Sequence, residues 1–149
     1  EITFSTGYLL GDEGSGYDLG KLFLQFYFQN QLPAYIKHDF EKTNNMNFSD
    51  ILSEIYKSKN PKFYIANLTR FIKKHEDDKF IADMIKASFL SFLKKHPFTH
   101  PKFNQFKFGF IGSIAFYFRD YIDLIMKKHN LEYIILKKPI ENIKYYYLD

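Results

Sequence analysis

The chain has 149 residues, a net charge of +4 and no cysteine, and 20% of it is aromatic. Without cysteine it cannot form disulfides, thiolate metal sites or a thiol nucleophile, which fits a reducing cytoplasm. No apolar run approaches the ~18 residues of a membrane span, and the lysines stand in scattered pairs at predicted helix ends rather than in a long basic run. We expect one cytoplasmic domain with no nucleic-acid and no membrane partner.

Helical periodicity dominates the first two thirds of the chain. Residues 2–10 alternate loosely and predict a strand. Several helix starts are marked by Asp, Asn or Ser, and Pro61 stands at a first helical position. The predicted helices cover residues 17–28, 33–42, 48–56 (capped by Asn47 or Ser49), 61–75 and 79–95 (capped by Asp77 or Asp78).

The last third alternates between the two kinds of secondary structure. Residues 106–111 predict a strand, 113–129 a helix that stops at a left-handed Asn130, and 132–136 a second strand. This order predicts parallel pairing through a right-handed crossover. Residues 139–147 predict a closing short helix. The chain is therefore expected to be a single helix-rich α/β domain.

Glycine is confined to two clusters, with none between residues 21 and 108. The first cluster contains the run Gly-Asp-Glu-Gly-Ser-Gly at 11–16, just before a predicted helix. A carboxylate in such a turn can accept two charge-assisted hydrogen bonds from sugar hydroxyls, so Asp12 is the candidate ligand and Glu13 a brace of the turn. The spacing equally allows a plain helix start, in which an acid and Ser15 cap free amides.

The second cluster stands between a predicted buried strand, 108–111, and a helix. Nucleotides commonly bind at the carboxyl ends of strands in open α/β sheets. Gly112 would let a flat base or ribose lie on the backbone, and Ser113 would cap the helix or donate to the ligand. A tight strand-to-helix turn without a ligand is the alternative.

The five histidines do not predict a metal site. His96 and His100 are four residues apart, but the prolines beside them prevent a helix from aligning them. We expect both to lie in surface loops. The pair His38-Asp39 and the run 75–78 are expected to be solvated polar turns.

Residues 6–21 resemble the hallmark motif of the N-acetylglucosamine kinase and BadF/BadG/BcrA/BcrD-type ATPase family, within the sugar kinase, Hsp70 and actin superfamily. Residues 110–115 resemble its adenosine motif, and residues 137–141 its usual tail. The resemblance covers essentially the whole chain. It implies that residues 1–149 form a helix-rich, ribonuclease-H-like (actin-like ATPase) carboxyl-terminal lobe with a small mixed sheet.

The resemblance also implies roles for single residues. In the family's kinases, the Asp of the glycine-rich motif holds hydroxyls of the amino sugar, and that position is Asp12. The backbone just before it lines the sugar pocket, which implies that Ser5, Thr6 and Gly7 lie there. The Gly-Ser of the adenosine motif faces ATP, and an alanine of the helical interior approaches the adenine. These nucleotide-binding positions are Gly112, Ser113 and Ala66.

Two features of these kinases are missing from this chain. Their phosphate loop of the Asp-Gly-Gly-Ser/Thr-Lys-Thr kind does not occur, and the catalytic Asp belongs to the same amino-terminal half. The chain also does not begin with Met. We therefore expect this chain to be a carboxyl-terminal half that carries no catalytic base and leaves most Mg²⁺ contacts to the other half. We also expect it to be inactive alone, because phosphoryl transfer needs positioning, Mg²⁺ and charge stabilisation together.

The resemblance implies an ATP- and Mg²⁺-dependent kinase that phosphorylates N-acetylglucosamine or a related amino sugar. One alternative is a BadF/BadG-type ATPase that activates a partner protein, although those activators carry cysteines for an iron–sulfur cluster and this chain has none. Another is a non-catalytic binding domain. The aromatic surplus and the habit of the family favour a homodimer.

Overall fold

The computed structural model describes residue 7 and residues 11–138 of the chain. These residues belong to two compact units, Glu1–Ser88 and Phe89–Asp149. The strand predicted at 2–10 and the helix predicted at 139–147 lie outside the described residues, apart from Gly7.

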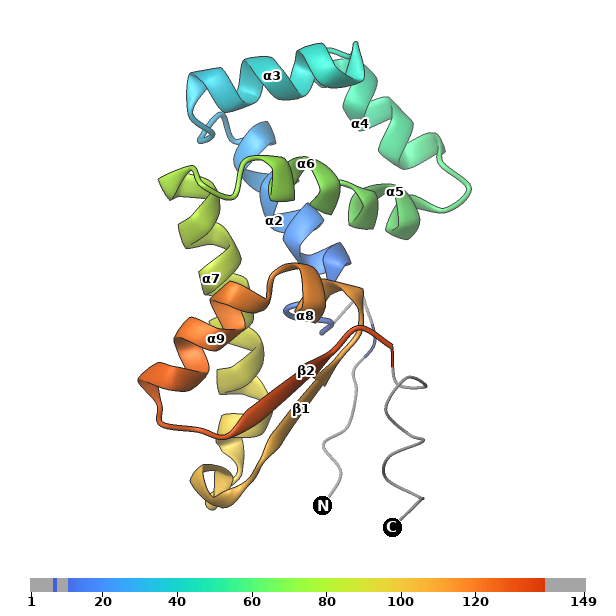
Figure 1. Ribbon diagram of the computed structural model, residues 1–149. Coiled ribbons are helices and arrows are strands. Elements are labelled where there is room, and N and C mark those ends of the chain that lie inside the picture. The colour runs from blue at the N-terminus through green and yellow to red at the C-terminus, as the bar shows by residue number, and fades with distance from the viewer. Residues whose placement is uncertain (1–6, 8–10, 139–149) are drawn as a thin grey trace. The chain divides into compact units, whose positions relative to one another are not determined.

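The first unit is helical wherever it is described (Figure 1). Its elements are α2 (Gly16–Phe28), α3 (Ala34–Asn44), α4 (Phe48–Lys57), α5 (Pro61–Asn67), α6 (Thr69–Lys74) and the first part of α7 (Lys79–Lys95). Asn47 caps α4 through a reciprocal capping box with Asp50, and Asp78 accepts from the amides of Phe80 and Ile81 at the start of α7. The predicted starts of α4 and α7 are confirmed, because local side chains satisfy the free amides there.

The helix predicted over 61–75 is interrupted, so this prediction is wrong at its centre. Leu68 separates α5 from α6, and its amide donates to the carbonyl of Ile65 over 3.1 Å. The Thr69 hydroxyl donates to the carbonyl of Ala66 over 2.7 Å. A Thr hydroxyl that bonds to the backbone competes with the helical ladder, which accounts for the break.

Aromatic rings fill the core of the first unit. Phe23, Tyr27 and Phe40 are 0% exposed, and Phe71 is 8% exposed. The ring of Phe40 meets that of Phe23 at 4.8 Å edge to face, and those of Tyr27 and Phe71 at 5.2 Å. Edge-to-face contacts match the positive edge of one ring to the negative face of another. The aromatic surplus is thus used, in this unit, for packing.

The second unit contains the sheet. Its elements are the end of α7, two short 3₁₀ turns (η1, Pro97–Thr99, and η2, Phe103–Gln105), β1 (Phe108–Ile111), α8 (Ser113–Tyr117), α9 (Arg119–Lys128) and β2 (Tyr133–Leu136). The strands pair in parallel, with Phe108 opposite Tyr133 and Ile111 opposite Leu136. They lie side by side in Figure 1. The predicted parallel pairing is confirmed, as is the left-handed Asn130, whose φ is 52°.

Two expectations for this unit are corrected. The helix predicted over 113–129 is divided at Phe118, which is 2% exposed and leaves the helical conformation with φ −107° and ψ 25°. The strand predicted as buried is half-exposed, because Phe108 and Phe110 are partly buried whereas Gly109 and Ile111 are exposed. Only two strands occur among the described residues, and a sheet covered on one face shows this alternation.

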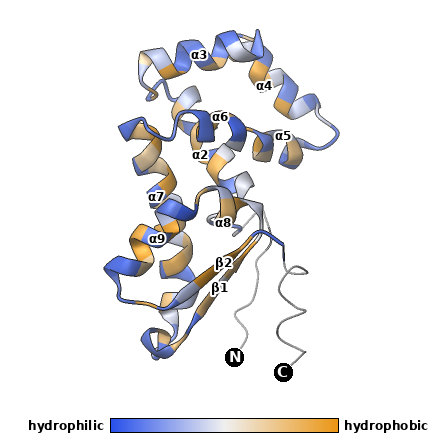
Figure 2. Ribbon diagram, in the orientation of Figure 1, coloured by the Kyte–Doolittle hydropathy of each residue, from blue (hydrophilic) through white to orange (hydrophobic). Residues whose placement is uncertain are grey.

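Lysines are placed where they complement the dipoles of the helices. Lysine pairs occupy the last turns of α6, α7 and α9, as predicted, where cations complement the helix dipole. Figure 2 shows hydrophilic and hydrophobic residues interspersed along these helices, while both strands are mainly hydrophobic. Within residues 11–138, none of the helices is long and apolar enough to cross a membrane.

Candidate functional site

The glycine-rich turn at 11–16 leads directly into α2. Asp12 and Gly14 both have φ near 71°, in the left-handed region. The amide of Ser15 donates to the carbonyl of Asp12 over 3.1 Å and closes the turn. The hydroxyl of Ser15 accepts from the amide of Asp18 over 3.1 Å, so Ser15 caps α2, as the alternative of a plain helix start expected.

The carboxylate of Asp18, which the sequence pattern did not single out, braces this turn, and the bracing role predicted for Glu13 stays a prediction. Asp18 is 6% exposed and accepts from the amide of Gly14 over 3.2 Å and from the hydroxyl of Ser88 over 2.7 Å. Lys21 approaches its other oxygen at 3.5 Å. An acid three residues after a Ser cap was the signal that could have identified it.

Asp12 is oriented by a partner on another helix. Its carboxylate lies 3.3 Å from the ammonium of Lys62 on α5. The side chain of Asp12 is 33% exposed and that of Lys62 is 46% exposed. A partly exposed carboxylate in a rigid turn can still accept hydrogen bonds from the hydroxyls of a ligand. This geometry agrees with the predicted ligand role and does not test it.

A close contact between backbones holds α5 against α2. A Cβ placed on Gly20 would lie 2.0 Å from the carbonyl oxygen of Ile65. The contact therefore requires glycine, and it sets the helix that carries Lys62 and Ala66 beside the helix that follows Asp12. Ala66 is half-buried. Asp12 and Ala66 thus belong to elements that pack together.

The remaining residues predicted for the sugar pocket precede this turn. Gly7 is exposed, has φ 71°, and its carbonyl accepts from the amide of Gly11 over 2.8 Å. Its conformation agrees with a glycine that shapes a backbone turn. Ser5 and Thr6 lie outside the described residues, so their predicted role stays a prediction.

The second glycine turn joins β1 to α8. Gly112 has φ 123°, and its amide donates to the carbonyl of Leu136 over 3.0 Å. A Cβ on Gly112 would meet no atom within 4 Å. Open space beside a backbone at the carboxyl end of a strand fits the flat group of a nucleotide.

Ser113 does not cap α8, so the capping role is wrong, and the other predicted role, donation to the ligand, stays a prediction. Gly112 occupies the cap position, and Ser113 is the exposed first residue of the helix. Lys137, directly after β2, lies over the rings of Phe116 and Tyr117 at 5.3 and 5.1 Å. The same edge of the sheet therefore carries a cation.

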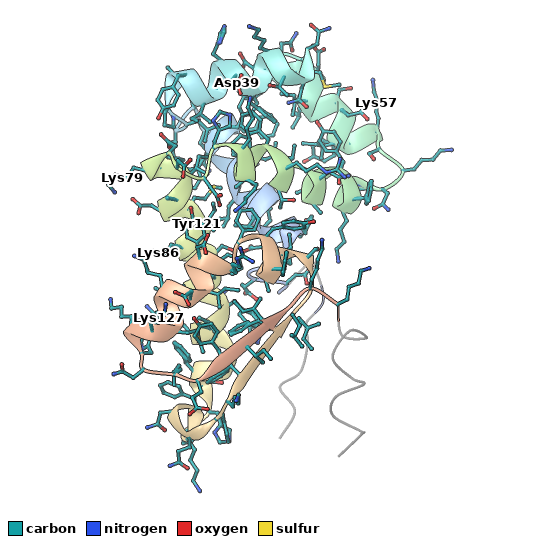
Figure 3. The ribbon with its side chains drawn as sticks, viewed as in Figure 1. Asp39, Lys57, Lys79, Lys86, Tyr121 and Lys127 are labelled. Atoms are coloured by element: carbon teal, nitrogen blue, oxygen red, sulfur yellow. The ribbon has the colours of Figure 1, made fainter. Side chains whose placement is uncertain are left out.

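The histidines are only partly as predicted. His38 and Asp39 lie within α3 rather than in a turn. Figure 3 marks Asp39 on this helix. Asp39 accepts from Lys74 at 2.9 Å and bonds to His75 at 2.8 Å, and these two partners lower the pKa of its carboxyl. His75 is therefore paired and packed on Phe71, at 4.5 Å between ring centres, rather than solvated.

Two further findings concern the surroundings of His100 and clusters that could bind a metal ion. His100 lies between the two 3₁₀ turns, and its Nδ1 accepts from the amide of Lys102 over 3.1 Å. Across residue 7 and residues 11–138, no group of three or more His, Asp or Glu side chains is placed to hold a metal ion.

These features define a helix-rich α/β fold with a small parallel sheet, the fold of one half of an actin-like ATPase. In particular, the chain is similar to the crystal structure of a "putative N-acetylglucosamine kinase" from Porphyromonas gingivalis, with 30% identity and a TM-score of 0.85. The similarity covers 94% of this chain and 50% of that protein. The resemblance and the fold predicted from the sequence are confirmed.

The chain spans half the length of this solved structure, so the activity of a whole kinase is not carried over with the fold. No model of a protein family matches the chain. No curated protein matches it either. The likeness thus concerns the fold of a half-molecule, and that this half is the carboxyl-terminal one stays a prediction.

Proposed function

We propose that this chain is the carboxyl-terminal half of a cytoplasmic, ATP-dependent sugar kinase whose acceptor is N-acetylglucosamine or a related amino sugar. The observation that carries the proposal is the match over 94% of the chain, at 30% identity, to a structure named for that activity. The two glycine turns, which contain residues with positive φ, lie at the motif positions that the resemblance assigns to the sugar and to ATP.

In this proposal Asp12 orients the sugar. Its carboxylate is partly exposed, and the ion pair with Lys62 at 3.3 Å restricts its direction. A carboxylate accepts hydrogen bonds only, so it selects hydroxyl and amide donors, which an amino sugar presents in pairs. The backbone at Ser5, Thr6 and Gly7 would complete the pocket. The base that removes the proton of the acceptor hydroxyl would come from the other half.

Gly112 would seat the nucleoside of ATP, with Ser113 next to it in the chain, and Ala66 is the position that the resemblance assigns to the adenine. The fit rests on the open space beside Gly112 and on the exposed hydroxyl of Ser113, which is not used as a cap. Mg²⁺ would neutralise the charge of the phosphates when bound. As the resemblance implies, its protein ligands would belong mainly to the other half.

The proposal is tested on the full-length protein by measuring ADP release with a panel of hexoses and hexosamines. Release that depends on one amino sugar, together with the phosphorylated sugar as product, supports the kinase and names its acceptor. ADP release at the same rate with and without any sugar contradicts the kinase and favours an ATPase. Absence of ADP release with every sugar, in a protein that binds ATP, would favour a binding domain.

A further inference from the structure

We propose that Asp18 and Ser88 form a buried positioning pair, which holds the turn at 11–16 in the conformation that Asp12 needs to bind a ligand. The inference deepens the proposed function and rests on it for the identity of the ligand. Asp18 and Ser88 are 70 positions apart in the sequence, and both belong to the first unit. Asp18 lies within the motif segment 6–21 and Ser88 lies outside it, and the proposal assigns neither residue to a contact with sugar or nucleotide.

The pair is enclosed and polar. Asp18 is 6% exposed and Ser88 is 2% exposed, and they are the buried polar residues of the described chain. One carboxylate oxygen, Oδ2, accepts both the Ser88 hydroxyl at 2.7 Å and the Gly14 amide at 3.2 Å. The other oxygen faces Lys21 at 3.5 Å. A buried carboxylate persists only when donors of this kind replace its water.

The bonding differs from an ordinary capping box in a way that matters for the turn. In that box the acid three residues into the helix accepts from the amide of the cap residue. Here the cap residue is Ser15, and its amide already donates to the carbonyl of Asp12. Asp18 therefore reaches one residue further, to Gly14. Its carboxylate therefore accepts from an amide within the turn instead of from the amide of the cap residue.

Asp12 needs such support because of its backbone. Its φ of 71° lies in the left-handed region, which Asp adopts more readily than most residues with a Cβ, and neighbouring contacts hold it there. Two hydrogen bonds hold it: the Ser15 amide donates to the Asp12 carbonyl, and the Gly14 amide donates to the Asp18 carboxylate. Ser88 fixes that carboxylate from α7. Helix α7 is thereby joined to the proposed sugar-binding turn.

The test compares variants of the full-length protein that break or keep these bonds. Asp18→Ala and Ser88→Ala remove them, whereas Asp18→Asn keeps an oxygen that can accept from both partners and serves as the conservative rescue. We expect the KM for the sugar to rise about tenfold in both Ala variants, with the KM for ATP changed less than about twofold. Asp18→Asn should remain near the wild type.

Matched controls are available on α7 itself. Asp83→Asn removes an exposed carboxylate that pairs with Lys79, and Ser91→Ala removes a half-buried hydroxyl on the same helix. Neither control should change the KM for the sugar. The double variant Asp18→Ala/Ser88→Ala should raise the KM for the sugar little more than either single variant does, because each substitution breaks the same hydrogen-bonded arrangement.

A second measurement does not depend on any ligand. Hydrogen exchange of the amides at 11–16 should accelerate in Ser88→Ala and Asp18→Ala, while exchange in α3 and α4 stays unchanged. Unchanged exchange in both variants, or equal losses of sugar and ATP affinity, would overturn the positioning role. If the wild type transfers phosphate to no sugar while the turn exchanges faster in both variants, the proposed function fails and the bracing of the turn stands.

Discussion

The carbonyl oxygen of Ile65 lies 2.0 Å from the position that a Cβ would take on Gly20. Real Cβ atoms essentially never come so close to a backbone oxygen, so the packing of α5 on α2 exists only with glycine at this position. Because α5 carries Lys62, the partner of Asp12, this contact also determines which charge faces the glycine-rich turn.

The first prediction follows from this contact. Gly20→Ala should force α5 away from α2 and lower the free energy of unfolding by about 1–3 kcal/mol, the usual cost of overpacking. The measurement is the midpoint of urea unfolding. Gly109→Ala is the matched control, because a Cβ there meets nothing within 4 Å. Equal effects of the two variants would contradict the role of the Gly20 contact.

The second prediction concerns Asp12. Asp12→Asn should raise the KM for the sugar about 10- to 100-fold, because charge-assisted hydrogen bonds to the ligand are lost, while ATP affinity stays nearly constant. Asn is the better replacement since it tolerates the left-handed φ of 71°. Asp12→Ala should raise the KM at least as much and also strain the turn.

The outcome that removes the sugar role of Asp12 is a comparable loss of sugar and ATP affinity in Asp12→Asn. Steady-state kinetics with each substrate varied in turn separates the two constants. Asp50→Asn provides a control, because that carboxylate caps α4 and lies in an exposed part of the same unit.

The third prediction concerns Gly112. Gly112→Val should weaken ATP binding strongly and leave sugar affinity nearly unchanged, since a side chain would occupy the open space beside the backbone. The variant also forces a β-branched residue to φ 123°, a conformation that L residues rarely adopt. Calorimetric titration with ATP, combined with the melting temperature, distinguishes a blocked site from an unfolded protein. Unaltered ATP affinity in a folded variant would eliminate the adenosine assignment.

The fourth prediction is a pH dependence. The hydroxyl of buried Tyr27 donates to Glu41 over 2.9 Å, and burial, followed by that hydrogen bond, raises the pKa of Tyr27 well above 10. The unfolded chain loses this proton near pH 10, before the folded chain does, so stability should fall as the pH rises above about 10. Urea unfolding between pH 7 and 11 measures this fall.

Tyr27→Phe should make that alkaline fall shallower and cost about 1 kcal/mol at pH 7 through the lost hydrogen bond. Tyr64 is the contrasting case, because its hydroxyl oxygen is buried with no hydrogen-bond partner among the described residues. Tyr64→Phe should therefore leave stability at pH 7 unchanged or slightly higher. A loss of unfolding free energy at pH 7 in Tyr64→Phe as large as that in Tyr27→Phe would contradict this distinction.

Much of the fold could be predicted from local signals. The caps at Asn47 and Asp78, the left-handed stop at Asn130 and the parallel pairing of 108–111 with 133–136 all occur where they were expected. Caps and turns depend on side chains within four residues of the amides they satisfy. Such information is contained in a short window of sequence.

The breaks within the helices were not predictable in this way. The helical patterns of 61–75 and 113–129 continue through Leu68 and Phe118, which are apolar and good candidates for a buried helix face. Both residues are buried, at 7% and 2% exposure. Helical periodicity alone does not distinguish a buried residue inside a helix from a buried residue at which one helix ends and the next begins.

For the candidate site, the amino-acid sequence alone determined the glycine turns, the acid at 12, the Ser15 cap and the resemblance to a kinase family, because each of these is written in neighbouring residues. Only the tertiary structure decided that Asp18 braces the turn, that Ser88 on α7 holds Asp18, and that Lys62 faces Asp12. The physical reason is that a buried carboxylate is stabilised by whichever donors the packing of helices brings to it, and those donors are up to 70 positions away in the chain.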